Sequence, residues 1–336
     1  ISLTFDESFK FLIPIALIVL PAFLAIFYGV ITYLFIIFKQ KKLVSSFLIF
    51  SLIFGIVEFI RGHVLGGFPW NLIVYSLTNY LHSIQILSVI GTYSLNLLSI
   101  SLFTLPVILF FKLRIKFKLM GIFLILAVIL FNNLYGYLNI NKFNKTNKEK
   151  INYKIKIINP NITIDRFLNI DDSEPLIREI INISKTKRNE KNLYIFPEGI
   201  FSHIYYSDLK YYRKIFKENF SDQDIIILGM NTQKIENGKN KIFNSLIVVD
   251  NNLKLISKYD KIKLVPFGEF LPFENFLSIF GLKKITDGYQ SFSSSKSKRE
   301  VIELNLNNLS FIPLICYEII YSGKINSSNK NNNFII

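Results

Sequence analysis

The sequence predicts an α-helical transmembrane bundle in the first 140 residues, followed by an α/β domain. Three observations predict this class. The 336-residue chain is 51% hydrophobic with a mean hydropathy of +0.36, which exceeds what a soluble domain usually carries. The apolar excess lies almost entirely before residue 140. The remainder alternates charged and apolar residues, as soluble domains do.

Four apolar runs in the first part are long enough to cross a bilayer. Residues 11–38 form a run of 28 residues without a charge, against the ~20 that span ~30 Å of hydrocarbon. Further spans are expected at 43–60, 86–111 and 119–140, although Asn132 and Asn133 interrupt the last. The alternative is a set of buried helices in a large soluble protein. It is disfavoured because so many apolar runs in so short a segment are hard to bury in protein alone.

Short basic loops set the expected orientation. Lys41 and Lys42 follow the first span, and the basic segment 112–118 follows the third. Short loops rich in Lys and Arg remain cytoplasmic. The loop at about 62–85 and everything after the fourth span are then external. Long domains translocate largely regardless of charge, so we expect the α/β domain on the external face.

Two polar features of the membrane part have open interpretations. Glu58 and Arg61 lie three residues apart on one helix face, which permits an ion pair at the membrane boundary. A structural clamp is favoured over a substrate role for this pair. The external loop contains Gly-Gly-Phe-Pro-Trp-Asn at 66–71, and an indole beside a proline turn suits the headgroup region. From the residues alone, Trp70 is expected to be an interfacial anchor.

A polar linker at 141–150 is expected to join the two parts, and residues 151–336 alternate strand-like and helical patterns. Helical spacing covers 172–185, with acidic residues near its start. Strands are expected at 153–159, 193–196, 224–228, 242–249 and 309–316. Because the chain begins at Ile1 and residues 334–336 resemble a strand cut off midway, we expect a fragment at both ends. The α/β domain is then truncated at its C-terminus.

Composition argues against several kinds of partner and site. The formal net charge is +15, but Lys, Asn and Ile are abundant even in loops such as 326–333. No arginine-rich groove or nucleic-acid motif occurs, so nucleic acid is not an expected partner. Cys316 is the only cysteine, which excludes an intrachain disulfide and a cysteine-cluster metal site. The three histidines are scattered, and we expect no metal and no cofactor.

Reactive side chains appear where three of the expected strands end. Glu198 closes one strand, Lys261 and Glu269 lie in the segment 259–269, and Cys316 and Glu318 close another. Sites in α/β proteins form at the carboxyl ends of strands. A thiol nucleophile needs a base, and an attacked ester carbonyl needs a donor for its oxyanion.

Taken singly, these residues have simpler explanations, because a lone cysteine is usually buried in the core and a loop lysine is usually solvated. Their joint occurrence favours a site. In it, Glu198 is the base, Lys261 stabilises the oxyanion and Cys316 is the nucleophile.

Glu, Lys and Cys in this order, each at a strand end, resemble the nitrilase superfamily. The strings 261–272, ending Pro-Phe-Gly-Glu-Phe-Leu-Pro, and 315–318, Ile-Cys-Tyr-Glu, are similar to its apolipoprotein N-acyltransferase branch. So are Glu-Phe-Ile-Arg-Gly at 58–62 and Gly-Phe-Pro-Trp-Asn at 67–71, in a membrane part that soluble nitrilases lack. The resemblance covers about residues 40–336, and it implies a nitrilase-like αββα sandwich for the second domain.

The resemblance also implies roles for individual residues. The expected catalytic residues are Glu198, Lys261 and Cys316. The residues expected to support the thiolate and the lysine, or to help hold the site, are Glu269, Tyr317, Glu318 and Asn244. The expected substrate contacts are Phe68, Trp70 and Phe167, the last of which stands where the family often has a tryptophan.

The reaction implied by the resemblance is two-step acyl transfer in a bacterial inner membrane, with the catalytic domain on the periplasmic side. Cys316 takes an acyl chain from a membrane phospholipid as a thioester. The amine of a diacylglyceryl-cysteine on an apolipoprotein then accepts the chain. The implied partners are therefore the lipid bilayer, the phospholipid donor and the apolipoprotein acceptor.

Two alternative functions remain open at this point. A membrane-tethered, nitrilase-like amidase would use the same three residues to cleave a small amide, with water as the acceptor. A non-enzymatic membrane protein, such as a transporter or an assembly factor, would carry an external domain that has lost activity. The intact set of Glu198, Lys261 and Cys316 disfavours the second alternative.

Overall fold

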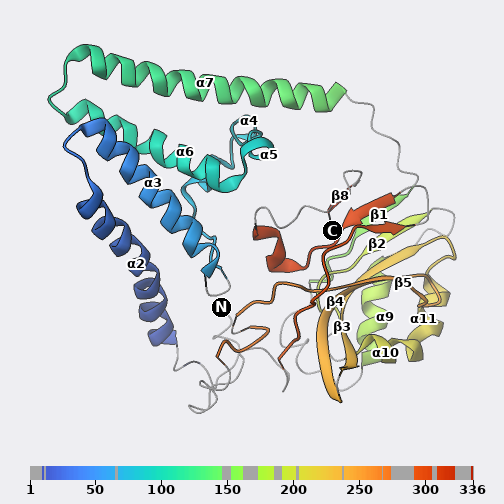
Figure 1. Ribbon diagram of the computed structural model, residues 1–336. Helices are drawn as coiled ribbons and strands as arrows, with labels where there is room; N and C mark the ends of the chain where they lie inside the picture. The colour runs from blue at the N-terminus through green and yellow to red at the C-terminus, as the bar shows by residue number, and fades with distance from the viewer. Residues whose placement is uncertain are drawn as a thin grey trace. The chain divides into compact units, whose positions relative to one another are not determined.

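The structure, a computed structural model, describes residues 10, 13–64, 67–145, 153–161, 173–184, 191–201, 204–236, 238–266, 268–273, 291–304, 309–321 and 334–335. The chain divides into two compact units, Ser8–Glu149 and Lys150–Ile336. The first unit is helical and the second contains the β-sheets (Figure 1).

Four helices of the first unit are long and apolar enough to cross a membrane, by length and composition. Helices α2 (Ile13–Phe38) and α3 (Leu43–Arg61) are separated by a short basic turn, and they pack against each other. The third span, Thr92–Phe110, joins α6 (Thr92–Thr104) to the 3-10 helix η4 (Leu105–Phe110), and the fourth is α7 (Ile115–Lys145). Between α3 and α6 lie the short helices η3 (Ile73–Leu77), α4 (Leu81–Ile84) and α5 (Leu87–Ile90).

The third span starts later than the sequence predicts. Gly91 adopts φ +77 between α5 and α6, a conformation that breaks a helix and that glycine adopts readily. Residues 87–90 therefore form the separate short helix α5 rather than the start of the span. At its far end α6 tightens into the 3-10 helix at Pro106, where proline has no N–H to continue the α-helical bonding.

Helix α7 is continuous through Asn132 and Asn133 and extends to Lys145, beyond the expected end of the span at 140. The two asparagines do not interrupt the helix because their amides face α4. The Asn132 amide donates to the backbone carbonyl of Ser83 at 2.9 Å, and the Ser83 hydroxyl donates to Asn133 at 3.0 Å. Polar side chains that hydrogen-bond between helices are compatible with an apolar environment.

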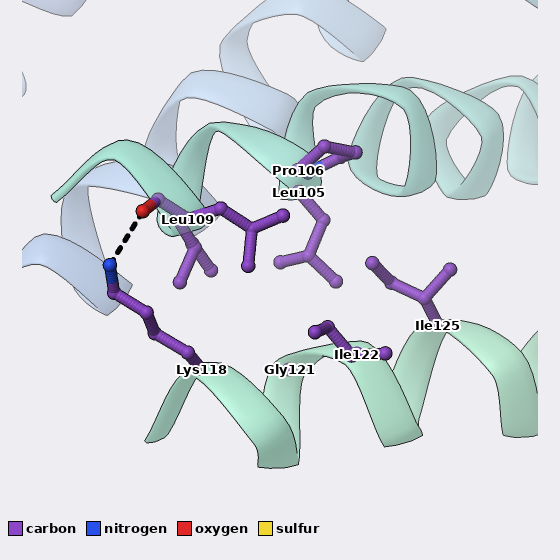
Figure 2. Close-up of a pocket in the computed structure, with 8 residues that line it drawn as sticks. Leu105, Pro106, Leu109, Lys118, Gly121, Ile122 and Ile125 are labelled. Carbon is purple, nitrogen blue, oxygen red and sulfur yellow. Dashed lines mark hydrogen bonds between the residues drawn. The ribbon is translucent and has the colours of Figure 1, made fainter. Parts of the chain in front are cut away.

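A small cavity of about 60 Å³ lies between η4 and α7 (Figure 2). Aliphatic side chains from both helices point into it, and the Lys118 ammonium donates to the backbone carbonyl of Leu109 at 2.6 Å. This contact satisfies one of the carbonyls that the end of a helix leaves without an intrahelical partner. The side chains that line the cavity are those of Leu105, Pro106, Ile108, Leu109, Lys118, Ile122 and Ile125.

The second unit contains two sheets. The larger has five strands in the order β1-β2-β3-β4-β5, of which the first three are parallel and the last two pairings are antiparallel. Its strands are β1 (Lys154–Ile157), β2 (Asn192–Ile195), β3 (Ile225–Glu236), β4 (Lys239–Val249) and β5 (Leu255–Asp260). The smaller sheet contains β6 (Ile302–Leu304), β7 (Leu309–Ile312) and β8 (Phe334–Ile335). Because β5 runs parallel to β2, the carboxyl ends of these two strands lie at the same edge.

Two apolar cores hold the sheets in layers. One face of the five-stranded sheet packs against helices on a core that includes Ile177, Phe216 and Ile226. These helices are α9 (Ser173–Ser184), α10 (Tyr206–Leu209), the 3-10 helix η5 (Lys210–Tyr212) and α11 (Arg213–Asn219). The opposite face packs on the three-stranded sheet through residues such as Val248 and Phe311. Apolar membrane helices joined to a layered α/β domain confirm the predicted class.

The strands differ from the predicted ranges mainly at the edges. Strand β5, on the edge of the large sheet, was not expected because it mixes apolar, polar and charged side chains without a regular pattern, and only Tyr259 is buried. Strand β7 ends at Ile312, and Cys316 instead begins the 3-10 helix η7 (Cys316–Ile320). The expected strand 309–316 is therefore a strand followed by a turn that carries the thiol.

Candidate active site

Glu198 lies in the turn that follows β2. The Phe196 N–H donates to Ile227 of β3 and the Ile200 N–H donates to Gly229, so both sides of the turn are fixed to the neighbouring strand. A Cβ atom on Gly229 would lie 2.5 Å from the Glu198 Cα and 2.7 Å from the Pro197 carbonyl oxygen. Glycine at this position therefore lets the Glu198 turn pass directly over β3.

Lys261 follows β5 and is almost completely buried, with 1% of its surface exposed. Its ammonium lies 3.1 Å from Glu198 Oε1 and 3.0 Å from Glu269 Oε1. Burial alone would lower the pKa of Lys261, but the charges of Glu198 and Glu269 outweigh it and hold the pKa above its ordinary value. Lys261 is therefore a permanent cation and a hydrogen-bond donor rather than a base.

Asn244, on β4, joins the two carboxylates. Its side-chain amide donates to Glu198 Oε1 and to Glu269 Oε1, both at 2.6 Å. Glu269 is held in turn by the Val265 N–H, which donates to its second oxygen at 2.9 Å. Two negative charges thus share one buried cation and one buried amide, and the geometry of all four groups is fixed by hydrogen bonds.

Cys316 presents an exposed thiol at the turn after β7. Its backbone has φ +47, a left-handed conformation that costs a non-glycine residue about 1–2 kcal/mol. Burial and the charge of Glu198 raise the pKa of Cys316 above its ordinary value, although Lys261 opposes the shift. Glu198 raises this pKa both by its charge and as a hydrogen-bond acceptor, whereas the Tyr317 backbone lowers it. The Glu198 carboxylate thus lies beside the thiol, where it can accept the thiol proton.

Glu318 is buried directly behind the Cys316 turn. One of its oxygens accepts the backbone N–H groups of Ile262 and Lys263 at 3.0 Å, and the other accepts the N–H of Ile315 at 3.1 Å. These residues flank Lys261 and Cys316. A single carboxylate therefore ties the lysine loop to the cysteine turn.

The structure brings six of the expected site residues into one cluster. Glu198, Lys261, Asn244, Glu269 and Cys316 interact directly, and Glu318 binds the backbone beside two of them. Tyr317 follows the thiol, and its ring packs edge-on against Tyr321 at 5.4 Å. Phe167 lies outside the described residues. Among the described residues, no group of three or more His, Cys, Asp or Glu side chains is placed to hold a metal ion.

Phe68 and Trp70 belong to the helical unit. The Trp70 ring is 48% exposed and stacks on Phe68 at 6.1 Å. The Trp70 carbonyl accepts an N–H from Arg61 at 3.0 Å. Arg61 is buried and also lies 3.3 Å from Glu58, whose other oxygen accepts the Asn96 amide. The ion pair expected from the spacing of Glu58 and Arg61 is present, and it fixes the backbone beneath an exposed indole.

The cluster contains residues that the sequence did not indicate. Arg299 and Tyr259 both bind the Glu318 carboxylate. The Ser295 N–H donates to the Lys261 carbonyl at 3.0 Å, and the Ser294 hydroxyl donates to that of Ile262 at 2.5 Å. Ser294, Ser295 and Arg299 lie in a segment rich in Ser and Lys that has the composition of a solvated loop, so no local signal marked them. Tyr259 lies on β5, where nothing in the sequence pairs it with Glu318.

The architecture and this cluster agree with comparisons to known families. Residues 161–335 match the family described as carbon-nitrogen hydrolase, and residues 2–105 match the one described as apolipoprotein N-acyltransferase N-terminal domain. The chain belongs to the carbon-nitrogen hydrolase family, and its first part is similar to the N-terminal domain of apolipoprotein N-acyltransferases. The predicted family and the nitrilase-like domain are thereby confirmed, and the described residues supply three layers of the αββα sandwich.

Two curated relatives and one solved structure are similar to parts of this chain. The apolipoprotein N-acyltransferase of Rhodopseudomonas palustris is 28% identical over 96% of this chain and 61% of its own length. That of Rhizobium leguminosarum bv. trifolii is 28% identical over 98% of this chain and 62% of its own. The chain thus spans about three fifths of these relatives. A solved amidase from Nesterenkonia sp. AN1 is 12% identical, with a TM-score of 0.29, over 52% of this chain and 59% of that one.

Proposed function

We propose that this protein is an apolipoprotein N-acyltransferase that moves an acyl chain from a membrane phospholipid, through a thioester on Cys316, to the amine of a diacylglyceryl-cysteine. The observation that carries the proposal is the grouping of Glu198, Lys261 and Cys316 at one site, in a chain that also has helices long and apolar enough to cross a membrane. A nucleophile with a base and a cation performs acyl transfer. A membrane anchor suits substrates that reside in the bilayer.

In the first step Glu198 takes the thiol proton while the sulfur attacks the ester carbonyl. Lys261 donates two of its three N–H groups to Glu198 and Glu269 within the described part of the chain, which leaves a third for the developing oxyanion. When the ester bond breaks, the leaving alkoxide takes the proton from Glu198 and departs as lysophospholipid. The thioester remains on Cys316.

In the second step the neutral amine of the acceptor attacks the thioester carbonyl. Glu198 takes a proton from the attacking nitrogen, and the amide forms as the sulfur leaves. The proton then returns to the sulfur. Asn244 and Glu269 keep Lys261 and Glu198 in place through both steps, and neither exchanges a proton with substrate.

The test is mass spectrometry of the full chain incubated with phospholipid in detergent. We expect an acyl mass on the peptide that contains Cys316, released when a diacylglyceryl-cysteine peptide is added. The Cys316→Ser variant should carry no such mass, because a serine hydroxyl is far less ionised than a thiol. Hydrolysis of a small amide without formation of a lipid thioester would favour the membrane-tethered amidase instead.

The proposed location is a bacterial inner membrane with the catalytic domain on the periplasmic side. Support comes from Lys41 and Lys42, which follow the first span, and from the basic segment 112–118, which follows the third. In a Cys316→Ser background, Ser76→Cys should react with a membrane-impermeant thiol reagent added outside spheroplasts, and Lys116→Cys should not. Labelling of Lys116→Cys from outside would reverse the orientation.

A further inference from the structure

The Glu318 carboxylate holds the active-site backbone but cannot be stable by itself. Its side chain is fully buried, and a carboxylate removed from water must be neutralised or hydrogen-bonded at every lone pair. Three backbone N–H groups, from Ile262, Lys263 and Ile315, supply part of that compensation. A positive charge beside the carboxylate would complete the compensation.

Arg299 supplies that charge. Its guanidinium lies 3.0 Å from Glu318 Oε1, and the arginine side chain is itself only 8% exposed. It also donates to the Tyr259 hydroxyl at 3.1 and 3.3 Å and lies over the tyrosine ring, 5.7 Å from its centre. The Tyr259 hydroxyl donates to both Glu318 oxygens at 2.8 Å. Burial and the Glu318 charge raise the pKa of Tyr259, so this hydroxyl remains a donor.

We propose that Arg299 is a positioning residue of the active site, which acts through the Glu318 carboxylate to hold the Lys261 loop and the Cys316 turn together. The inference rests on the proposed function only in that it takes Lys261 and Cys316 as the reacting pair. Without Arg299, the buried carboxylate would take up a proton or turn towards solvent. The three backbone N–H groups would then lose their charged acceptor, and Lys261 would move relative to the thiol.

The experiment measures the rate of Cys316 alkylation by iodoacetamide against pH in the full chain. This reaction needs no phospholipid, so its result stands even if the chain never forms a lipid thioester. In Arg299→Leu we expect alkylation to slow by about tenfold or more, as for truncating one partner of a buried charge pair. The pH midpoint should rise, because Lys261 lowers the pKa of the thiol only while it stays close. Arg299→Lys should recover part of the rate.

Three further variants separate positioning from general stability. If Arg299 acts through Glu318, then adding Arg299→Leu to Glu318→Gln should cause no further loss, because contacting residues are not additive. The double variant removes both charges, so neither is left buried without a partner. Its alkylation rate can therefore be measured even if Arg299→Leu alone does not fold. The matched control is Arg178→Leu, which removes an arginine from an exposed ion pair with Glu174 on α9, and it should leave the profile unchanged.

Three results would overturn the proposal. The first is a folded Arg299→Leu variant with the wild-type rate and midpoint. The second concerns the double variant. If its alkylation rate falls below that of Glu318→Gln by the same factor as Arg299→Leu falls below wild type, the two residues act independently. The third is an Arg299→Lys variant whose Cys316 is alkylated no faster than in Arg299→Leu. The positive charge at this position would then not account for the effect.

Discussion

Gly229 lies directly beneath Glu198, so close that a Cβ atom there would be 2.5 Å from the Glu198 Cα. The position of the proposed base is therefore set by the absence of a side chain on the neighbouring strand. Gly229 touches no reacting group, yet nothing larger fits without moving the Glu198 backbone.

The Gly229→Ala variant should lose acyl transfer by roughly 100-fold, because a displacement of about 1 Å at a reacting group has that effect. It should also be less stable by about 1–3 kcal/mol, as overpacked sites are. The loss of transfer is measured by acyl-enzyme formation, and the loss of stability by thermal unfolding in detergent. Gly29→Ala, where no atom lies within 4 Å of the added Cβ, is the control. Unchanged transfer in Gly229→Ala would mean that the turn tolerates displacement.

The Glu198→Gln variant should separate thiol ionisation from catalysis. Burial and the Glu198 charge together raise the pKa of Cys316. Removing the charge therefore lowers the thiol pKa, and the midpoint of iodoacetamide alkylation should move to lower pH. Transfer should nevertheless be lost, because glutamine cannot accept the proton. A midpoint that moves upward, or transfer that persists, would assign the base to another residue.

Asn244→Asp should disable the site by adding a third carboxylate around one lysine. Like charges at this spacing force one group to protonate, which removes the base or displaces the lysine. We expect acyl-enzyme formation to fall by about tenfold or more, measured at constant phospholipid. Asn240→Asp, an exposed position on the same strand, is the matched control. Equal effects of the two substitutions would show that net charge rather than the position of the carboxylate is responsible.

Trp70→Ala should reduce the use of lipid without reducing thiol chemistry. The loss of aromatic contact with an acyl chain or headgroup is worth about 1–3 kcal/mol, or roughly 5- to 150-fold in acyl-enzyme formation from phospholipid. Alkylation by iodoacetamide should stay normal. Tyr80→Ala, which removes another exposed aromatic ring from the same loop, is the control. A parallel loss of both activities would make Trp70 a structural anchor.

The sequence was most informative where a reactive side chain stands at the end of an expected strand. Glu198 and Cys316 were predicted as site residues because each follows an apolar run of residues, and Lys261 because it begins the distinctive segment 261–272. Arg299 and Tyr259 were not, since a buried ion pair between residues far apart in sequence leaves no local pattern. The start of the third span was wrong for a related reason: residues 86–90 are apolar, and only the positive φ of Gly91 separates them from the helix.

The tie between Glu318 and the Lys261 loop has a consequence for synthesis of the protein. The N–H of Lys263 and the carboxylate that accepts it are 55 residues apart, and Glu318 leaves the ribosome after Cys316. Until it does, neither the lysine loop nor the cysteine turn has its acceptor, and a contact between such distant residues forms slowly. The membrane helices can thus be inserted before the thiol and the lysine are brought together, which happens only when both loops bind the Glu318 carboxylate.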